Sequence, residues 1–272
     1  MRSLRKLTHL RHRGFPPMAN LSSWNIRSLN WANKQEEVKL FLHSHNIGWK
    51  WAHNFTLNPK GRLWLAWNPK EYKVVVLQIT EQFIHTRATQ LYSQKDIYAT
   101  FVYGFNHAQQ RAPMWADLET ISHQMQEAWC VLGDFNTILR KEDRLGGGEV
   151  ADYELQELQN CLDSRELTEM PYSGAYYTWS NKTVWSRIDR ALINGYWHDP
   201  FDYTHAEFPA NELSDHSTII IQFLQTSKPR HSFQYCDMWS HHPTNQGLIS
   251  QALAQVKGSN YFQQMQIFLA TL

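Results

Sequence analysis

Short apolar runs typical of β-strands alternate with amphipathic helical segments along this chain, and that alternation restricts the possible folds most strongly. Apolar residues at helical spacing predict helices over 33–45, 110–126 and 153–161. Strand-like runs outnumber them and lie at 19–26, 61–67, 73–79, 83–91, 97–103, 128–132, 176–180, 186–193, 203–208 and 217–224. The four runs between 61 and 103 are predicted to form a meander. We therefore expect an α/β (α+β type) fold in which two packed sheets are flanked by helices.

Composition agrees with such layers and excludes other classes. Hydrophobic residues make up 42% and charged residues 19% of the 272, which excludes a disordered chain and a coiled coil. The 12 tryptophans favour broad packed layers over a small helical bundle. No apolar run is long enough to span a bilayer, so we expect no membrane segment. Cys130, Cys161 and Cys236 are widely spaced and odd in number, which predicts a reducing compartment and no zinc site.

Composition also divides the chain into three predicted parts. Residues 1–18 are basic, contain no acid and lack the apolar core of a secretory signal, so we expect a disordered leader, with Met1 or Met18 as the start, and no secretion. Residues 19–225 form the predicted globular domain. Residues 226–272 read as a linker and a partial helical segment. The net charge is +1, and without the leader the chain is mildly acidic, which argues against non-specific coating of DNA.

Four clusters of polar residues lie where predicted strands end and loops begin, a common position for catalytic groups. They are Trp24-Asn25, Gly133-Asp134-Phe135-Asn136, Arg187-Ile188-Asp189-Arg190 and Ser214-Asp215-His216. Each cluster alone has a structural interpretation. Asn25 could cap the next helix, the Gly133 cluster could be an Asx turn, Asp189 could form a surface ion pair, and His216 could be a satisfied buried imidazole.

Together, the clusters supply several carboxylates, two amides and one histidine, without a cysteine nucleophile or a Gly-Lys-Ser/Thr phosphate loop. This set suits metal-assisted attack of water on a phosphodiester, because hard oxygen ligands favour Mg²⁺ and Asp or His can manage the proton of the water. Ser214, Asp215 and His216 are not a serine-hydrolase triad, because consecutive strand residues point to opposite faces.

The ordered motifs resemble the endonuclease/exonuclease/phosphatase family, and most of all the endonuclease domain of plant non-LTR (LINE-type) retrotransposon polyproteins. The resemblance covers about residues 19–223. The motifs that carry it are Ser23-Trp24-Asn25-Ile26-Arg27, Phe101-Val102-Tyr103-Gly104, Leu132-Gly133-Asp134-Phe135-Asn136, Tyr177-Thr178-Trp179-Ser180-Asn181, Ser186-Arg187-Ile188-Asp189-Arg190 and Ser214-Asp215-His216-Ser217. It implies a four-layered α/β sandwich of two mostly antiparallel sheets, with the active site at one edge, and DNA as the partner.

The resemblance also implies catalytic roles. Asp134 would orient or deprotonate the attacking water, with Asn136 beside the phosphate. Asp189 would orient His216, which would clamp or protonate a phosphate oxygen. Tyr103 would contact the scissile phosphate.

Further roles concern the metal and the substrate. Asn25 and Asp215 would serve a Mg²⁺ site, which Mn²⁺ could also fill. Thr178, Arg187 and Ser214 would bind substrate, with Thr178 and Arg187 on the DNA-facing rim. A reverse transcriptase segment would follow in such polyproteins and is not among these residues.

The chain departs from the family pattern at one place. Family members carry a strand ending in a metal-ligand Glu after the first helix, whereas here the helical segment passes directly into Gly48-Trp49-Lys50-Trp51, and no acidic residue occurs between Glu37 and Glu71. We therefore predict that one strand and its Glu are missing. Loss of this ligand should weaken Mg²⁺ binding and catalysis, because small misplacements cost about 10²-fold in rate.

The leading interpretation is a Mg²⁺-dependent DNA endonuclease domain with impaired activity. One alternative is a non-catalytic remnant that binds nucleic acid or protein. Another is a phosphatase or phosphodiesterase of the same superfamily. The ancestral substrate suggests the nucleus, with the cytoplasm as the other possibility.

Overall fold

The computed structural model describes residues 21–24, 50–57, 63–201, 203–210 and 214–223. All of these residues lie within one compact unit, Met1–Gln225. The leader, the helix predicted over 33–45, Asn25 and the segment after 225 lie outside the described residues.

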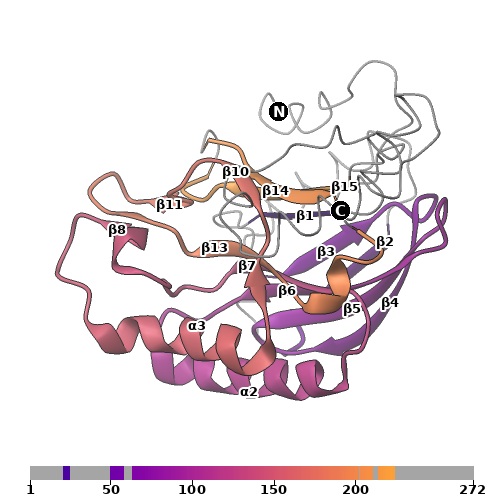
Figure 1. Cartoon of the computed structure of the whole chain (residues 1–272), viewed down its shortest axis with the longest axis horizontal. Helices are drawn as coiled ribbons and strands as arrows, with labels where there is room; N and C mark the ends of the chain where they lie inside the picture. Colours follow the sequence, from indigo (N-terminus) through magenta and orange to yellow (C-terminus); the bar gives the residue numbers. More distant parts are fainter. Residues whose placement is uncertain (1–20, 25–49, 58–62, 202, 211–213, 224–272) are drawn as a thin grey trace, which may run out of the picture. The chain divides into compact units, whose positions relative to one another are not determined.

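A six-stranded sheet forms the centre of the fold (Figure 1). Its order is β4 (Tyr72–Ile79), β5 (Phe83–Gln90), β6 (Asp96–Tyr103), β7 (Trp129–Asp134), β13 (Asp189–Ile193) and β9 (Thr168–Glu169). Every neighbouring pair is antiparallel except β6 and β7, which α2 (Ala108–Gln124) connects. A parallel pair needs such a crossover connection.

Three smaller sheets complete the strand inventory of the described residues. The four-stranded sheet has the order β1 (Leu21–Trp24), β15 (Thr218–Phe223), β14 (Thr204–Phe208) and β10 (Tyr172–Gly174). A three-stranded sheet consists of β11 (Trp179–Ser180), β12 (Trp185–Ser186) and β8 (Arg144–Leu145). A hairpin consists of β2 (Lys50–His53) and β3 (Trp64–Trp67). The short 3₁₀ turns are η2 (Lys141–Asp143) and η3 (Gly195–Trp197).

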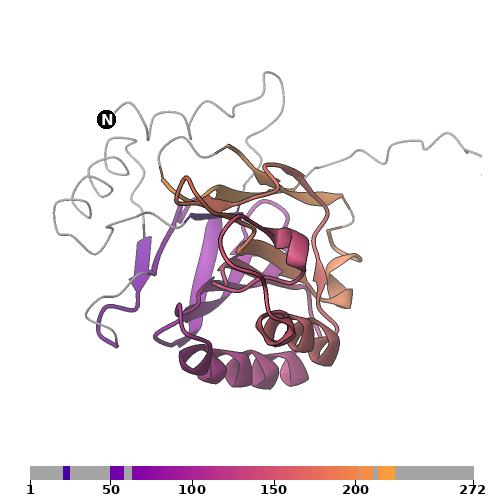
Figure 2. The same ribbon diagram turned by 90° about the vertical axis from the view of Figure 1, so that its left-hand side faces the viewer.

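Two apolar cores define the layers. The first core lies between the six-stranded sheet and the four-stranded sheet, and the second lies between the six-stranded sheet and α2 with α3 (Asp152–Arg165). Both views place the two helices on one side of the central sheet and β1, β15, β14 and β10 on the other (Figures 1 and 2). The described part is therefore the predicted α/β sandwich. The described helices cover the outer face of the six-stranded sheet.

Strand β7 is apolar from Trp129 to Leu132 because both of its faces are covered. Cys130 and Leu132 enter the core between the sheets, whereas Trp129 and Val131 enter the core beneath the helices. Successive strand residues point to opposite faces, so a strand covered on both sides needs apolar residues at every position. The short run at 128–132 was predicted as a strand for this reason, and the structure extends it to Asp134.

The predicted meander is partly wrong. β4, β5 and β6 form an antiparallel meander, but the strand at 61–67 is reduced to Trp64–Trp67 and pairs with β2 instead of joining them. Among the described residues, the β2–β3 hairpin is a sheet separate from β1, although side chains of both pieces pack into the same core.

The predicted strand 186–193 is also interrupted. Its beginning pairs in β12 and its end in β13, while the intervening backbone bonds elsewhere. The Arg187 N–H donates to the Asp143 carbonyl oxygen at 2.8 Å, and the Phe135 N–H donates to the Ile188 carbonyl oxygen at 2.9 Å. The break turns the chain from one small sheet into the central sheet just before Asp189. The described part of the chain contains no helix long and apolar enough to cross a membrane.

Candidate active site

Three predicted site residues form a row across the end of the central sheet. Tyr103 is the register partner of Asp134 in the β6–β7 pair, and Asp134 is the partner of Asp189 in the β7–β13 pair. Directly paired residues of neighbouring strands project from the same face of a sheet. The two carboxylates therefore lie side by side, and both residues are only 2% exposed.

Two glycines let the ends of β6 and β7 approach this closely. Gly133 has φ +137°, and a side chain there would collide with the Val102 carbonyl oxygen. Gly104 donates its N–H to the Asp134 carbonyl oxygen at 2.7 Å, and an added Cβ would lie 2.7 Å from the Phe135 carbonyl oxygen. Only glycine tolerates such conformations and contacts without strain, so both positions follow from the backbone geometry of the site.

His216 completes the cluster from the segment that precedes β15. Its Nδ1 lies 2.9 Å from Asp189 Oδ2, and its Nε2 lies 3.7 Å from Asp134 Oδ2. A carboxylate can only accept a hydrogen bond, so Nδ1 carries the proton that is shared with Asp189. The imidazole is 8% exposed and lies against Trp179, with ring centroids 6.4 Å apart.

Charge, and not burial, sets the protonation state of His216. Burial by itself would lower its pKa, but the hydrogen bond to Asp189 and the negative charges of Asp189, Asp134 and Asp215 outweigh that effect and raise the pKa to about 9. The ring is therefore an imidazolium at neutral pH. An imidazolium between two carboxylates is suited to stabilise or protonate an anionic oxygen.

Asn136 is folded back onto Asp134. It adopts a left-handed conformation with φ +49°, which asparagine tolerates better than most residues. Its N–H donates to Asp134 Oδ1 at 2.9 Å, and its Nδ2 donates to the Gly104 carbonyl oxygen at 2.7 Å. The Asx-turn interpretation of this motif and its placement in the cluster both hold, because the turn itself orients the Asp134 carboxylate.

Ser214, Asp215 and Thr178 surround His216. Ser214 Oγ donates to Asp215 Oδ1 at 3.2 Å and accepts the His216 N–H at 3.3 Å. Thr178 Oγ1 accepts the N–H of Asp189 at 3.0 Å, and its carbonyl oxygen accepts the N–H of Ser217 at 2.7 Å. Thr178 is fully buried, so its observed position differs from the DNA-facing rim expected for it. Its contacts instead link the backbones that carry Asp189 and His216.

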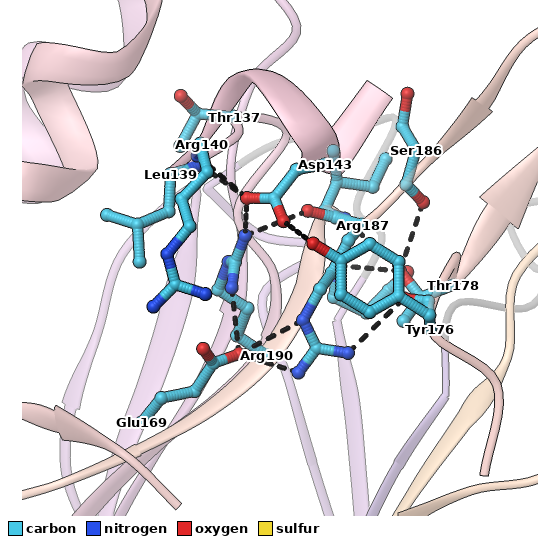
Figure 3. Close-up of polar contacts among 12 residues, drawn as sticks. Thr137, Leu139, Arg140, Asp143, Glu169, Tyr176, Thr178, Ser186, Arg187 and Arg190 are labelled. Atoms are coloured by element: carbon cyan, nitrogen blue, oxygen red, sulfur yellow. Dashed lines mark hydrogen bonds and ion pairs between the residues drawn. The ribbon is translucent and has the colours of Figure 1, made fainter. Parts of the chain in front are cut away.

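The structure contradicts the rim position expected for Arg187. Its side chain is 1% exposed and donates to Glu169 Oε1 at 2.6 Å (Figure 3). The guanidinium also stacks on the Tyr172 ring, 3.8 Å from the ring centroid. An acid and aromatic rings enclose the guanidinium inside the protein. It has no surface to offer DNA.

The donor atoms of Asp134, Asp189 and His216 lie within 4.8 Å of one another, which is close enough to hold a metal ion. The carboxylate oxygens fit a hard cation such as Mg²⁺, and Asp215 adds a third acid beside them. His216 fits less well as a ligand, because a bound metal needs the neutral imidazole. The oxygen donors therefore suit the ion, while His216 suits the phosphate.

Three residues near the site carry no recognisable sequence signal. Asp143, Glu169 and Tyr176 contact the arginines on either side of Asp189, yet they come from separate segments with no recognisable motif. The pairing of Arg187 and Arg190 around Asp189 was the one available signal. Asn25 directly follows β1 in sequence and lies outside the described residues.

The fold and the site together place the protein in a known class. The family model for the endonuclease/exonuclease/phosphatase family matches residues 19–216, and the chain belongs to that family. A search of curated proteins gave no match.

Two solved structures illustrate the shared fold. One is the endonuclease domain of TRAS1, a telomere-specific non-LTR retrotransposon, at 14% identity and TM-score 0.55, covering 76% of this chain and 100% of that one. Another is the AP endonuclease LMAP from Leishmania major, at 12% identity and TM-score 0.56, covering 78% of this chain and 90% of that one. At these identities the likeness concerns the fold.

Proposed function

We propose that this chain is a DNA endonuclease domain of retrotransposon origin that hydrolyses phosphodiesters with Mg²⁺ or Mn²⁺ and has been weakened by loss of the metal-ligand Glu. The observation that carries the proposal is the buried His216 imidazole held between Asp134 and Asp189. Membership of the family supports the reaction class. The six ordered motifs support the retrotransposon origin, DNA as substrate and a nuclear setting.

The residues divide the hydrolysis between them. Asp134, held by the backbone of Asn136, orients a water molecule and takes its proton as the water oxygen bonds to phosphorus. His216, held by Asp189, donates an N–H to a phosphate oxygen, where negative charge develops as the bond to the leaving sugar oxygen breaks. Tyr103 lies beside Asp134 in the same row and contacts the phosphate. A bound Mg²⁺ would supply Lewis acidity and charge stabilisation at the leaving sugar oxygen, which takes a proton from solvent.

The weakening follows from the ligand set. Asp215 and Asn25 would hold the ion, with no acidic residue between Glu37 and Glu71 to replace the missing Glu. A site with fewer anionic ligands binds Mg²⁺ more weakly, so activity should require millimolar metal and should be higher with Mn²⁺.

The test is nicking of supercoiled plasmid by the purified full chain in Mg²⁺ and in Mn²⁺. The control is the double variant Asp134→Ala/His216→Ala, with circular dichroism to show that both proteins are folded. Metal-dependent nicking that is lost in the double variant supports the proposal. A folded chain that leaves DNA intact at high Mn²⁺ overturns it and favours the non-catalytic remnant, and hydrolysis of a small phosphodiester that DNA does not inhibit favours the phosphodiesterase.

A further inference from the structure

A buried charge cluster lies beneath the candidate active site and has no place in the proposed chemistry. Its members are two arginines, two acids and one phenol from separate segments of the chain: Asp143, Glu169, Tyr176, Arg187 and Arg190 (Figure 3). Glu169 Oε1 accepts hydrogen bonds from both arginines, at 2.6 Å from Arg187 and 2.8 Å from Arg190. The two positive and two negative charges balance within the cluster.

Asp143 is the most completely bonded member. One carboxylate oxygen accepts the backbone N–H groups of Leu139 and Arg140, each at 2.9 Å, and also the Arg190 guanidinium. The other oxygen accepts the Tyr176 hydroxyl at 2.8 Å. Burial would raise the pKa of Asp143, but Arg190, Tyr176 and the backbone amides outweigh it and hold the pKa below its ordinary value. The carboxylate is therefore ionised.

The contacts of the cluster converge on the backbone around Asp189. The Arg187 N–H donates to the Asp143 carbonyl oxygen at 2.8 Å, two residues before Asp189. The Arg190 guanidinium, one residue after Asp189, donates to the Asp143 carboxylate and to the Arg187 carbonyl oxygen. Asp143 thus fixes the chain on both sides of the residue that faces His216.

The same carboxylate also reaches the other catalytic segment. Leu139 and Arg140 follow Asp134 and Asn136 in the loop that leaves β7. Asp143 binds their amides while Arg190 binds Asp143, so one carboxylate ties the loop after Asp134 to the strand that begins with Asp189. A displacement of either segment would change the distance between Asp134 and the Asp189–His216 pair.

We propose that Asp143 and Arg190 are positioning residues, which hold Asp189 against His216 and set the spacing to Asp134. The inference rests on the proposed function and deepens it. A buried ion pair by itself adds little stability compared with apolar side chains of the same size. The position of this pair, between two catalytic segments, gives it a different use.

The experiment compares the buried carboxylate of Asp143 with the partly buried carboxylate of Glu157, each of which binds an arginine. Asp143→Asn keeps an acceptor for Leu139 and Arg140 but removes the charge, whereas Asp143→Ala removes both. The matched controls are Glu157→Gln and Glu157→Ala. Glu157 binds Arg111 Nε at 2.9 Å and Trp115 Nε1 at 3.1 Å, and these bonds join α3 to α2, away from Asp189. All four variants are made in the full chain.

Plasmid nicking gives the first readout. Asp143→Ala should lower the rate constant at saturating DNA about 10²-fold, with the DNA dissociation constant unchanged, because a displacement of about 1 Å costs that much. Asp143→Asn should lower it by about tenfold or less, since a hydrogen-bonded carboxamide preserves most of the geometry. The Glu157 variants should keep the rate of the original chain.

Proton NMR gives a second readout that needs no activity and can be made on Asp143→Asn if Asp143→Ala does not fold. The Nδ1 proton of His216, bonded to Asp189, should give a downfield signal that Glu157→Gln retains and that Asp143→Asn broadens or shifts. Loss of the signal in His216→Gln assigns it. An unchanged signal and an unchanged rate in folded Asp143→Asn and Asp143→Ala would overturn the positioning role.

The two readouts separate the two proposals. If the original chain shows the His216 signal, the Asp143 variants disturb it and no protein nicks DNA, the positioning role stands and the endonuclease fails. If the original chain nicks DNA and the Asp143 variants nick it equally well, the endonuclease stands and the positioning role fails. Equal losses of stability in the Asp143 and Glu157 variants, without a change in rate, would mean that the cluster only supports the fold.

Discussion

Two buried histidines, His85 on β5 and His216 just before β15, have similar burial but different polar neighbours. His85 is 5% exposed, and its Nδ1 lies 2.8 Å from Thr100 Oγ1, which also accepts the Trp129 indole N–H. His216 is 8% exposed and faces Asp189 and Asp134. Burial lowers the pKa of His85 to about 4, whereas three acids raise the pKa of His216 to about 9.

The contrast distinguishes the core of the central sheet from the strand ends, where the candidate active site lies. The Thr100 hydroxyl, which also accepts the Trp129 indole N–H, bonds a neutral imidazole without charging it, so His85 serves the core. Carboxylates hold an imidazolium in place, and they do so at the strand ends where an anionic substrate could meet it. Burial alone therefore does not distinguish the functional histidine from the structural one, and the neighbouring charges do.

The largest expected effect comes from disturbing β7, which places Trp129 against His85 and Asp134 beside His216. Gly133→Ala forces a side chain onto φ +137° and against the Val102 carbonyl oxygen. We expect a loss of about 3–4 kcal/mol in the free energy of unfolding, measured by urea denaturation. Gly148→Ala is the control, because an added Cβ there meets nothing within 4 Å. Equal stability of the two variants would show that the end of β7 tolerates a different backbone.

Each histidine should make the free energy of unfolding depend on pH. His85 should cause a loss of stability towards acid pH, the acid limb, and His216 a loss towards alkaline pH, the alkaline limb. His85 has a lowered folded pKa, so its contribution is lost as the pH falls from about 6.5 towards 4, by about 3 kcal/mol. His216 has a raised folded pKa, so its contribution is present below pH 6.5 and is lost as the pH rises through about 9, by a similar amount.

Urea denaturation from pH 4 to 9 measures both limbs. The His85→Gln variant should flatten the acid limb, and the His216→Gln variant should flatten the alkaline limb. Retention of the alkaline limb in His216→Gln would mean that another group supplies it.

A smaller change should separate charge from burial directly. Asp189→Asn should lower the pKa of His216 by about 1–3 units, because it removes the hydrogen-bonded charge. Thr100→Val should leave the pKa of His85 below its ordinary value, because burial alone causes that shift. Histidine proton NMR titration measures both. A return of the His85 pKa to its ordinary value in Thr100→Val would contradict the assignment of its cause.

The sequence predicted the parts of this comparison that depend on local pattern. The apolar run of β7 and the polar motif after it marked both the central strand and Asp134. The clusters around Asp189 and His216 are recognisable as polar residues at predicted strand ends, and the resemblance implies their roles. Their proximity follows from the tertiary pairing of strands, which a single sequence does not encode. Asp143 and Glu169 could not be found, because their arginine partners lie 47 and 18 residues away in sequence. The rim position of Arg187 came from the resemblance, and the burial of its side chain depends on Glu169 and Tyr172, which are distant in sequence.

The smallest expected effect on stability concerns a charge pair that is only partly buried. Arg144 Nη1 binds Glu154 Oε2 at 3.0 Å, and both side chains are 28% exposed. Water screens such a pair, so Arg144→Gln should change the free energy of unfolding by about 0.5 kcal/mol or less in urea denaturation. Asp143, the residue before it, is fully buried and binds Arg190. If Arg144→Gln costs as much stability as Asp143→Asn, then the location of a charge relative to solvent does not matter here, and the contrast between His85 and His216 loses its explanation.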